Sequence, residues 1–225
     1  MKRLLWVLLS LFSPLLSAAK SPVTLFEMAG LHPAPASLAE SVVVMIDAQR
    51  EYVDGALPLA GVEAALEEGR RLLERARAAE APVIHVVQRG EGALFNPEGP
   101  YFAIAAPVVP VEGEVVIEKR APNAFAGTGL QKVLAATGRK KLIVVGFMTH
   151  MCLSTTVRAA LDLGYATTVV SAATATRDLP DGDGGTIAAR VVQQTSLAAL
   201  ADLFATVVER ADDIPAGSPA APPLR

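Results

Sequence analysis

The stretch Val144–Leu161 reads VVGFMTHMCLSTTVRAAL and contains Cys152, the single cysteine of a chain of 225 residues. Its first part continues an apolar, β-branched run that begins at Lys141, and its second part has apolar residues at helical spacing. This order predicts a buried strand followed by a helix, with the thiol at the opening of that helix. A lone thiol in such a place is an inert core residue, a bridge to another molecule or a reactive nucleophile.

Outward from this stretch, short apolar runs alternate with helical patterns. Predicted strands lie at Ser41–Ile46, Pro82–Val87, Glu114–Ile117, Lys141–Val145, Ala166–Val170 and Ala205–Val208. Predicted helices lie at Val62–Ala79, Leu130–Thr137, Met151–Leu163 and Thr186–Leu200, with a short one at Thr24–Gly30. Such alternation is typical of βαβ units, which build a parallel sheet covered by helices on both faces.

The amino-terminal residues have the pattern of a secretory signal over positions 1–19. Lys2 and Arg3 are followed by the apolar run Leu4–Leu16 and by small residues up to Ala19. The run is shorter than the ~20 residues that a membrane-spanning helix needs, and Pro14 interrupts it. We therefore expect cleavage after Ala19 and export, to the periplasm or out of the cell, with no membrane attachment of the mature form. An uncleaved anchor or a misplaced start codon is the alternative.

Composition divides the rest of the chain and narrows its partners. Residues 20–40 are predicted to be a linker with a short helix, residues 41–210 one α/β domain, and residues 211–225, rich in Pro, Ala and Gly, a disordered tail. Hydrophobic residues make up 52% of the chain and charged residues 19%, which provides enough apolar side chain for a large core. A net charge of −3 without any basic block argues against nucleic acid as a partner.

Reactive side chains follow the predicted strands at one edge of the sheet. The first strand is followed by Asp47 and the third by Glu118 and Lys119, while Cys152 lies a few residues beyond the fourth. Ligands of open parallel sheets bind outside the carboxyl ends of the strands, so these side chains are expected to meet. Singly, each has a more ordinary interpretation, as a turn residue, a solvated charge or a buried thiol. Together, an acid, an amine and a thiol indicate nucleophilic catalysis.

The three residue types suit one another chemically. A free thiol has a pKa of about 8.5, so it needs help to become a thiolate at neutral pH. A helix N-terminus and the Lys119 ammonium would stabilise that anion, and Asp47 would accept the thiol proton and pass it to a leaving amine. Because a carboxylate repels a thiolate, the three groups should titrate as a coupled set. Backbone N–H groups of Met148 and Cys152 are expected to hold the oxyanion.

Four motifs lie in order along the chain. They are VVMIDAQREYV (Val43–Val53), VIEKRAPNAFAGTGL (Val116–Leu130), VVGFMTHMCLSTTVRAALDLGY (Val144–Tyr165) and VVSAATATRD (Val169–Asp178). In their order and spacing they resemble the isochorismatase-like cysteine hydrolases, which include nicotinamidases and N-carbamoylsarcosine amidases. The resemblance implies a three-layer, doubly wound α/β fold with a six-stranded parallel sheet in the order 3-2-1-4-5-6.

The resemblance also assigns roles to residues. It implies that Asp47, Lys119 and Cys152 form the catalytic triad, that a cis peptide bond at Phe147–Met148 shapes the oxyanion hole, and that the protein is a homodimer or homotetramer. Residues close to these motifs are predicted to contact a small-molecule substrate, although a packing role is an open alternative for several of them. They are Gln49, Tyr52, Asn123, Phe125, Phe147 and His150.

The sequence departs from the nicotinamidases where those enzymes bind a metal. Their loop after the second strand carries an Asp and several His, whereas the loop Gln88–Ile104 has no histidine. The three histidines of the chain, His32, His85 and His150, have no metal-ligand spacing, and His85 is expected to be a core residue. We therefore expect neither a metal nor another cofactor.

These observations predict an exported cysteine hydrolase that cleaves an amide-type C–N bond of a small molecule through a thioester. Some members of the family that act on the vinyl ether of isochorismate lack the cysteine, so Cys152 favours amide chemistry. Two alternatives stay open at this point. One is a hydrolase of non-amide bonds such as a vinyl ether, and the other is a small-molecule binding protein without turnover.

Overall fold

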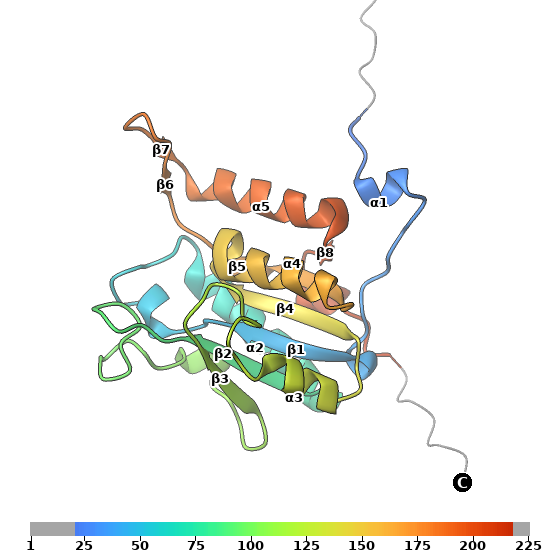
Figure 1. Cartoon of the computed structure of the whole chain (residues 1–225), viewed down its shortest axis with the longest axis horizontal. Helices are drawn as coiled ribbons and strands as arrows, with labels where there is room; N and C mark the ends of the chain where they lie inside the picture. Colours follow the sequence, from blue (N-terminus) through green and yellow to red (C-terminus); the bar gives the residue numbers. More distant parts are fainter. Residues whose placement is uncertain (1–20, 218–225) are drawn as a thin grey trace, which may run out of the picture.

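The computed structural model describes residues 21–217 (Figure 1). The predicted signal peptide therefore lies outside the described residues, as does the end of the predicted tail. Six strands form one parallel sheet in the order β3-β2-β1-β4-β5-β8. The sixth strand of this sheet along the chain is labelled β8 because β6 and β7, which form a separate hairpin, precede it. The predicted sheet order is confirmed.

The elements follow the predicted alternation closely. The strands are β1 (Ser41–Ile46), β2 (Val83–Gln88), β3 (Val115–Lys119), β4 (Lys141–Phe147), β5 (Ala166–Ala175), β6 (Leu179–Pro180), β7 (Thr186–Ile187) and β8 (Thr206–Val208). The α-helices are α1 (Leu25–Met28), α2 (Val62–Ala78), α3 (Leu130–Ala136), α4 (Ser154–Asp162) and α5 (Ala189–Leu203). Shorter helical turns are η1 (Leu38–Glu40), η2 (Arg50–Tyr52), η3 (Ala106–Val108), the π-helical η4 (Thr149–Leu153) and η5 (Ala211–Asp213).

The central strand β1 shows how both faces of the sheet are filled. All six of its residues are buried. Val43 and Met45 pack into the apolar cluster that α2 completes, while Val42, Val44 and Ile46 pack into the one completed by α3, α4 and α5. The split follows from the alternation of side chains along a strand. Helices accordingly cover both faces, with α2 behind the sheet and the others in front (Figure 1).

Gly146 marks the closest approach of β1 and β4. Its φ is +110°, in the region that favours glycine, and a Cβ atom placed there would lie 2.0 Å from the carbonyl oxygen of Ile46. The chain turns into η4 shortly afterwards and carries Cys152 with it. Only a residue without a side chain lets β4 reach the sheet edge in this position, so Gly146 helps to set where the thiol lies.

Two features differ from the sequence-based expectation near the carboxyl edge. Strand β5 continues to Ala175 rather than ending at Val170, with a shift in its pairing to β4. Within Asp178–Ala188, β6 and β7 form a small antiparallel hairpin that projects from the body (Figure 1), and α5 begins at Ala189 rather than at the predicted Thr186. Each strand of the hairpin is two residues long, too short to show the apolar alternation that marks a buried strand.

The predicted disordered tail begins too early. Ala211 and Ile214 are fully buried in the α2 cluster, and Arg75 of α2 donates hydrogen bonds to the carbonyl oxygens of both. The prediction relied on a composition rich in Ala and Pro, whereas contacts with a distant helix order these residues. Within residues 21–217, no helix combines the length and the hydropathy needed to cross a membrane.

Candidate active site

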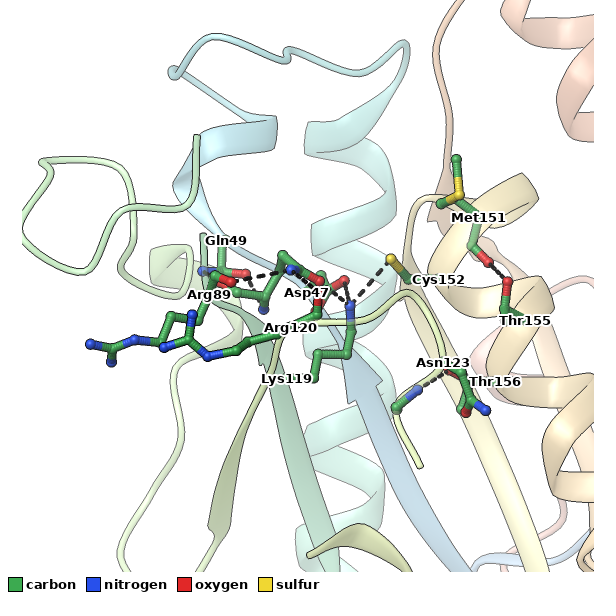
Figure 2. Close-up of polar contacts among 12 residues, drawn as sticks. Asp47, Gln49, Arg89, Lys119, Arg120, Asn123, Met151, Cys152, Thr155 and Thr156 are labelled. Carbon is green, nitrogen blue, oxygen red and sulfur yellow. Dashed lines mark hydrogen bonds and ion pairs between the residues drawn. The ribbon is translucent and has the colours of Figure 1, made fainter. Parts of the chain in front are cut away.

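Asp47, Lys119 and Cys152 come from three separate elements and meet at the carboxyl edge of the sheet (Figure 2). Asp47 follows β1, Lys119 is the last residue of β3, and Cys152 lies in η4 after β4. Strand β2 separates β1 from β3, and Gln88 at its end is the register partner of Lys119. The long side chain of Lys119 crosses the end of β2 to reach the other two residues.

The Lys119 ammonium connects the acid and the thiol. Its Nζ lies 2.8 Å from Oδ2 of Asp47 and 3.2 Å from Sγ of Cys152. A third contact, 2.6 Å long, joins Nζ to Oε1 of Gln88. The side chains of Lys119 and Asp47 are completely buried, and Cys152 is 5% exposed. The ammonium therefore donates hydrogen bonds to Gln88 and Cys152 and forms an ion pair with Asp47, in a site with almost no solvent.

The backbone turns sharply at Asp47. Its N–H still donates to Val86 of β2, over 2.7 Å, while its carbonyl oxygen already accepts the N–H of Gln49, also over 2.7 Å. Its φ of 49° lies in the left-handed region, which few residues other than glycine adopt and which Asp tolerates better than most. This conformation ends β1 and lets the carboxylate project over the sheet edge toward Lys119.

Burial shapes the protonation of the cluster. It raises the pKa of Asp47 against the opposing effect of Lys119. Burial, followed by the charge of Asp47, raises the pKa of the Cys152 thiol to about 12. Both shifts favour the protonated forms of the acid and the thiol. A thiolate beside the Asp47 carboxylate would place a second buried anion next to the first, which is costly even with Lys119 between them.

Proton transfer inside the cluster avoids that cost. If the thiol proton moves to Asp47, the cluster changes from carboxylate and thiol to carboxylic acid and thiolate, and its net charge stays the same. The ammonium of Lys119 contacts both groups, so it stabilises the negative charge at either end of the transfer. The arrangement can therefore produce a nucleophilic sulfur only when needed, with Asp47 as the base.

The turn that carries Cys152 contains the predicted oxyanion donors. The peptide bond Phe147–Met148 is cis, at the position that the resemblance assigns to it. The carbonyl oxygen of Met148 accepts the N–H groups of Met151, over 3.0 Å, and Leu153, over 3.3 Å. The N–H of Met148 donates to no acceptor among the described residues. It is thus available to a ligand, as an oxyanion donor must be.

Two predicted substrate-contacting residues lie beside the triad. The ring of Tyr52 packs edge-on against Phe95, 5.1 Å away, and against Phe147, 6.0 Å away. Burial, followed by the charges of Asp47 and Cys152, raises the pKa of Tyr52. These aromatic residues form an apolar wall near the reactive groups. Contact of Tyr52 and Phe147 with substrate stays a prediction.

His150 lies in η4, next to the end of β5. Its Nδ1 is 2.6 Å from Oγ1 of Thr176, and burial, together with the charge of Arg177, lowers its pKa. A neutral imidazole is therefore held in one orientation by the threonine hydroxyl. Its contact with substrate also stays a prediction.

The other predicted substrate residues have structural contacts. Gln49 is fully buried, and its amide nitrogen donates to the carbonyl oxygens of Gln88 and Phe102; contact of Gln49 with substrate stays a prediction. Asn123 accepts the N–H of Phe125 over 2.9 Å, which closes a turn. The ring of Phe125 stacks on Tyr165. A pocket role for Asn123 and Phe125 stays a prediction.

Two further polar residues, Gln88 and Arg177, lie at this edge and were not among the site residues predicted from the sequence. Arg177 follows β5 and affects the pKa of both Tyr52 and His150. Its Nε is buried without a hydrogen-bond partner in the described part of the chain, while Nη1 donates to the carbonyl oxygen of Asp178 over 3.0 Å. A signal existed, since Arg177 belongs to the last of the four motifs and follows a strand at the reactive edge.

The larger cavities lie away from the thiol. One of about 580 Å³ is lined by Arg75 and Arg139 at the amino end of the sheet, and one of about 530 Å³ lies between the first turns of α2 and α5. Cys152 does not line either cavity and is 5% exposed. Within residues 21–217, no three side chains of His, Cys, Asp or Glu come together as a metal site would require.

Comparison with known proteins places this geometry in context. The family model described as the Isochorismatase domain matches residues 41–212. A secreted isochorismatase effector, Isc1, of Verticillium dahliae is 41% identical over 82% of this chain and 96% of its own length. Maleamate amidohydrolase of Pseudomonas putida is 30% identical over 57% of this chain and 68% of its own. The crystal structure of an isochorismatase from Pseudomonas putida is 44% identical, with a TM-score of 0.82 over 86% of this chain and 99% of that one.

Proposed function

The chain belongs to the isochorismatase family of hydrolases, and from this premise we propose that it cleaves an amide-type carbon–nitrogen bond of a small molecule through a thioester on Cys152. The observation that carries the proposal is the position of the Lys119 ammonium, 2.8 Å from Asp47 and 3.2 Å from Cys152. No structural requirement of a parallel sheet explains an acid, an amine and a thiol buried in mutual contact, whereas nucleophilic catalysis needs all three.

The proposed first half-reaction forms the thioester. Sγ of Cys152 attacks the carbonyl carbon of the amide while its proton moves to Asp47. The carbonyl oxygen becomes an oxyanion, to which the N–H groups of Met148 and Cys152 donate. When the oxyanion collapses, the C–N bond breaks and Asp47 returns the proton to the leaving nitrogen, which departs as a neutral amine or ammonia.

The second half-reaction releases the acid. A water molecule attacks the thioester carbonyl and gives one proton to Asp47. Collapse breaks the C–S bond, and the departing sulfur recovers that proton. Lys119 stays protonated throughout, and the net charge of the three groups together with the bound substrate is the same at every stage, which suits a site excluded from solvent.

Arg177 indicates the kind of substrate. It is a cation at the same sheet edge, with a buried Nε that lacks a hydrogen-bond partner among the described residues. A guanidinium group can hold a carboxylate through two parallel hydrogen bonds. We infer that the amide carries an acidic or strongly polar group that Arg177 receives. The similarity to a maleamate amidohydrolase supports an amide of this type.

Export is part of the proposal. It is supported by the basic and apolar pattern of residues 1–19 and by the similarity to a secreted relative. The single thiol is compatible with an oxidising compartment, because no second cysteine of the chain exists to pair with it.

The test is to trap the thioester. The protein is mixed with a panel of small amides, with and without a carboxylate, and quenched in acid for intact-protein mass spectrometry. We expect an acyl adduct on Cys152 and release of ammonia or amine, both absent in Cys152→Ala. Turnover that survives in Cys152→Ala would exclude the thioester, and turnover of a vinyl ether alone would favour the non-amide alternative.

A further inference from the structure

Gln88 occupies the place that the Lys119 side chain must cross. It is the last residue of β2, and its Cα is the register partner of Lys119 on β3. Its Oε1 lies 2.6 Å from Nζ of Lys119, closer than either Asp47 or Cys152. Half-buried, it lies at the boundary between the ammonium and the surrounding loops.

The orientation of the Gln88 amide is defined by its other contacts. Nε2 donates to the carbonyl oxygens of Arg89, over 3.3 Å, and Arg120, over 3.2 Å. These two oxygens accept hydrogen bonds and cannot donate them, so the nitrogen of the amide must face them. The oxygen is left to face the ammonium. The amide thus joins the segments that follow β2 and β3 to the charged end of Lys119.

The backbone of Gln88 is held by a second glutamine. Its N–H donates to Oε1 of Gln49 over 2.8 Å, and its carbonyl oxygen accepts Nε2 of Gln49 over 3.1 Å. Gln49 is fully buried, and its remaining N–H donates to Phe102 over 2.8 Å. A continuous set of hydrogen bonds therefore leads from the turn after Asp47, through Gln49 and Gln88, to Lys119.

The chemistry of this third partner matters because the ammonium is completely buried. An apolar side chain here would leave one N–H without an acceptor, and the ammonium could turn away from the sulfur to find one. A carboxylate would satisfy the N–H but would add a second negative charge beside Asp47, which disfavours a thiolate. An uncharged amide oxygen avoids both problems.

We propose that Gln88 is a positioning residue, which directs the Lys119 ammonium at Asp47 and Cys152 and keeps the charge of the cluster balanced for proton transfer. This inference rests on the proposed function. Gln88 acts through Lys119, and Gln49 acts through Gln88. Partners of this kind, one contact removed from the reacting atoms, change activity by roughly 10- to 100-fold when they are replaced.

The experiment uses a probe that needs no knowledge of the substrate. Alkylation of Cys152 by iodoacetamide is followed by mass spectrometry from about pH 5 to about pH 9, and the rate of an ordinary thiol rises about tenfold per pH unit until the pH nears its pKa of about 8.5. In the wild-type protein we expect a plateau instead, because the proton goes to Asp47. The variants are Gln88→Leu and Gln88→Glu, with Gln193→Leu as the control, since Gln193 is a half-buried glutamine bonded to Thr174.

The expected results differ between the variants. Gln88→Leu should lower the plateau rate by roughly 10- to 100-fold. Gln88→Glu, which has the same size, should move the onset of alkylation to higher pH. Gln193→Leu should match the wild type. Once a substrate is known, both Gln88 variants should lower kcat with little change in KM. A purely structural role would lower the melting temperature without moving the pH profile.

The possible failures are distinct. If both Gln88 variants keep the wild-type plateau and onset, the positioning role is wrong while the proposed function stands. If the wild-type rate rises with pH like that of an ordinary thiol, and Asp47→Asn does not alter it, the proposed function fails first. Should Gln88→Leu not fold, Gln88→Asn supplies the same comparison, because it withdraws the amide by one carbon.

Discussion

Two buried ionic clusters lie against β2 and β3, and they have opposite properties. The first is the reactive cluster of Asp47, Lys119 and Cys152 at the carboxyl edge. The second, which we term the clamp, consists of Arg77 on α2, His85 on β2 and Glu114 just before β3. In the clamp, Glu114 Oε1 lies 2.8 Å from Nε of Arg77, and Oε2 lies 2.9 Å from Nε2 of His85.

The two carboxylates differ in how many hydrogen bonds they receive. Burial acts to raise the pKa of Glu114, yet hydrogen bonds from Arg77, from the backbone N–H of Val111 and from His85 lower it to about 2. Asp47 shares a single ammonium with a thiol and a glutamine, and burial raises its pKa. A carboxylate surrounded by donors stays ionised and stabilises the fold, whereas one with few donors can accept a proton. The number of donors, rather than the presence of an ion pair, separates the structural cluster from the reactive one.

Removing the thiol should have the largest effect on activity and little on stability. Cys152→Ala should lower kcat/KM by at least about 10³-fold, since no other group can form the thioester. Its free energy of unfolding should stay within about 1 kcal/mol of the wild type, because the thiol behaves as a small apolar group. Steady-state kinetics and urea denaturation check the two halves. A large loss of stability would mean that the reactive cluster also supports the fold.

Breaking the clamp should do the reverse. Glu114→Gln should lower the free energy of unfolding by about 2–3 kcal/mol, because it removes a carboxylate that is only 8% exposed from the guanidinium of Arg77 and the imidazole of His85. Activity per folded molecule should not change. The matched control is Glu118→Gln on β3; its side chain is 48% exposed and pairs with Arg89, and its loss should cost below about 1 kcal/mol. Equal costs for the two variants would contradict the distinction between the clusters.

Arg177 extends the comparison to substrate binding. Arg177→Gln should raise KM by about 10-fold or more for a carboxylate-bearing amide, because a charged hydrogen bond is lost, with a smaller change in kcat. For an uncharged amide, KM should be almost the same for the variant and the wild type. Arg190→Gln, at an exposed arginine on α5, serves as the control. A drop in kcat with constant KM would instead place Arg177 in the chemical step.

The smallest expected effect concerns pH. Burial lowers the pKa of His85 from 6.5, so the folded protein holds it neutral while the unfolded chain binds a proton more readily. The stability that depends on neutral His85 is therefore complete above pH 6.5 and is lost as the pH falls toward the lowered folded pKa. The slope cannot exceed about 1.4 kcal/mol per pH unit for one group. Urea denaturation across this range should show a flatter curve for His85→Gln, and His32→Gln, in the exposed linker, should follow the wild type.

Local patterns predicted most of the architecture. Apolar runs such as Ser41–Ile46 match strands because strands buried on both faces need apolar residues at every position. The predictions failed where the structure depends on contacts that local patterns do not contain. The later part of β5 and the ordered residues Ala211–Ile214 depend on contacts with segments far away in the chain. Strands β6 and β7 depend on pairing with each other.

The same division holds for the reactive edge. Asp47, Lys119 and Cys152 could be predicted to meet because the carboxyl ends of parallel strands lie together. Gln49 and Gln88 could not be separated by sequence, since both are glutamines near strand ends. In the structure, Gln49 is buried and accepts the backbone N–H of Gln88, whereas the side chain of Gln88 contacts Lys119.

By itself the amino-acid sequence determined the parallel α/β sheet and the three reactive residue types, since periodicity and strand ends are local properties. Only the tertiary structure decided that burial raises the pKa of the thiol, that Gln88 contacts the ammonium and that Nε of Arg177 has no hydrogen-bond partner among the described residues. Protonation and hydrogen bonding depend on burial and on distances of a few ångströms through space, and the spacing of residues along a chain does not contain that information.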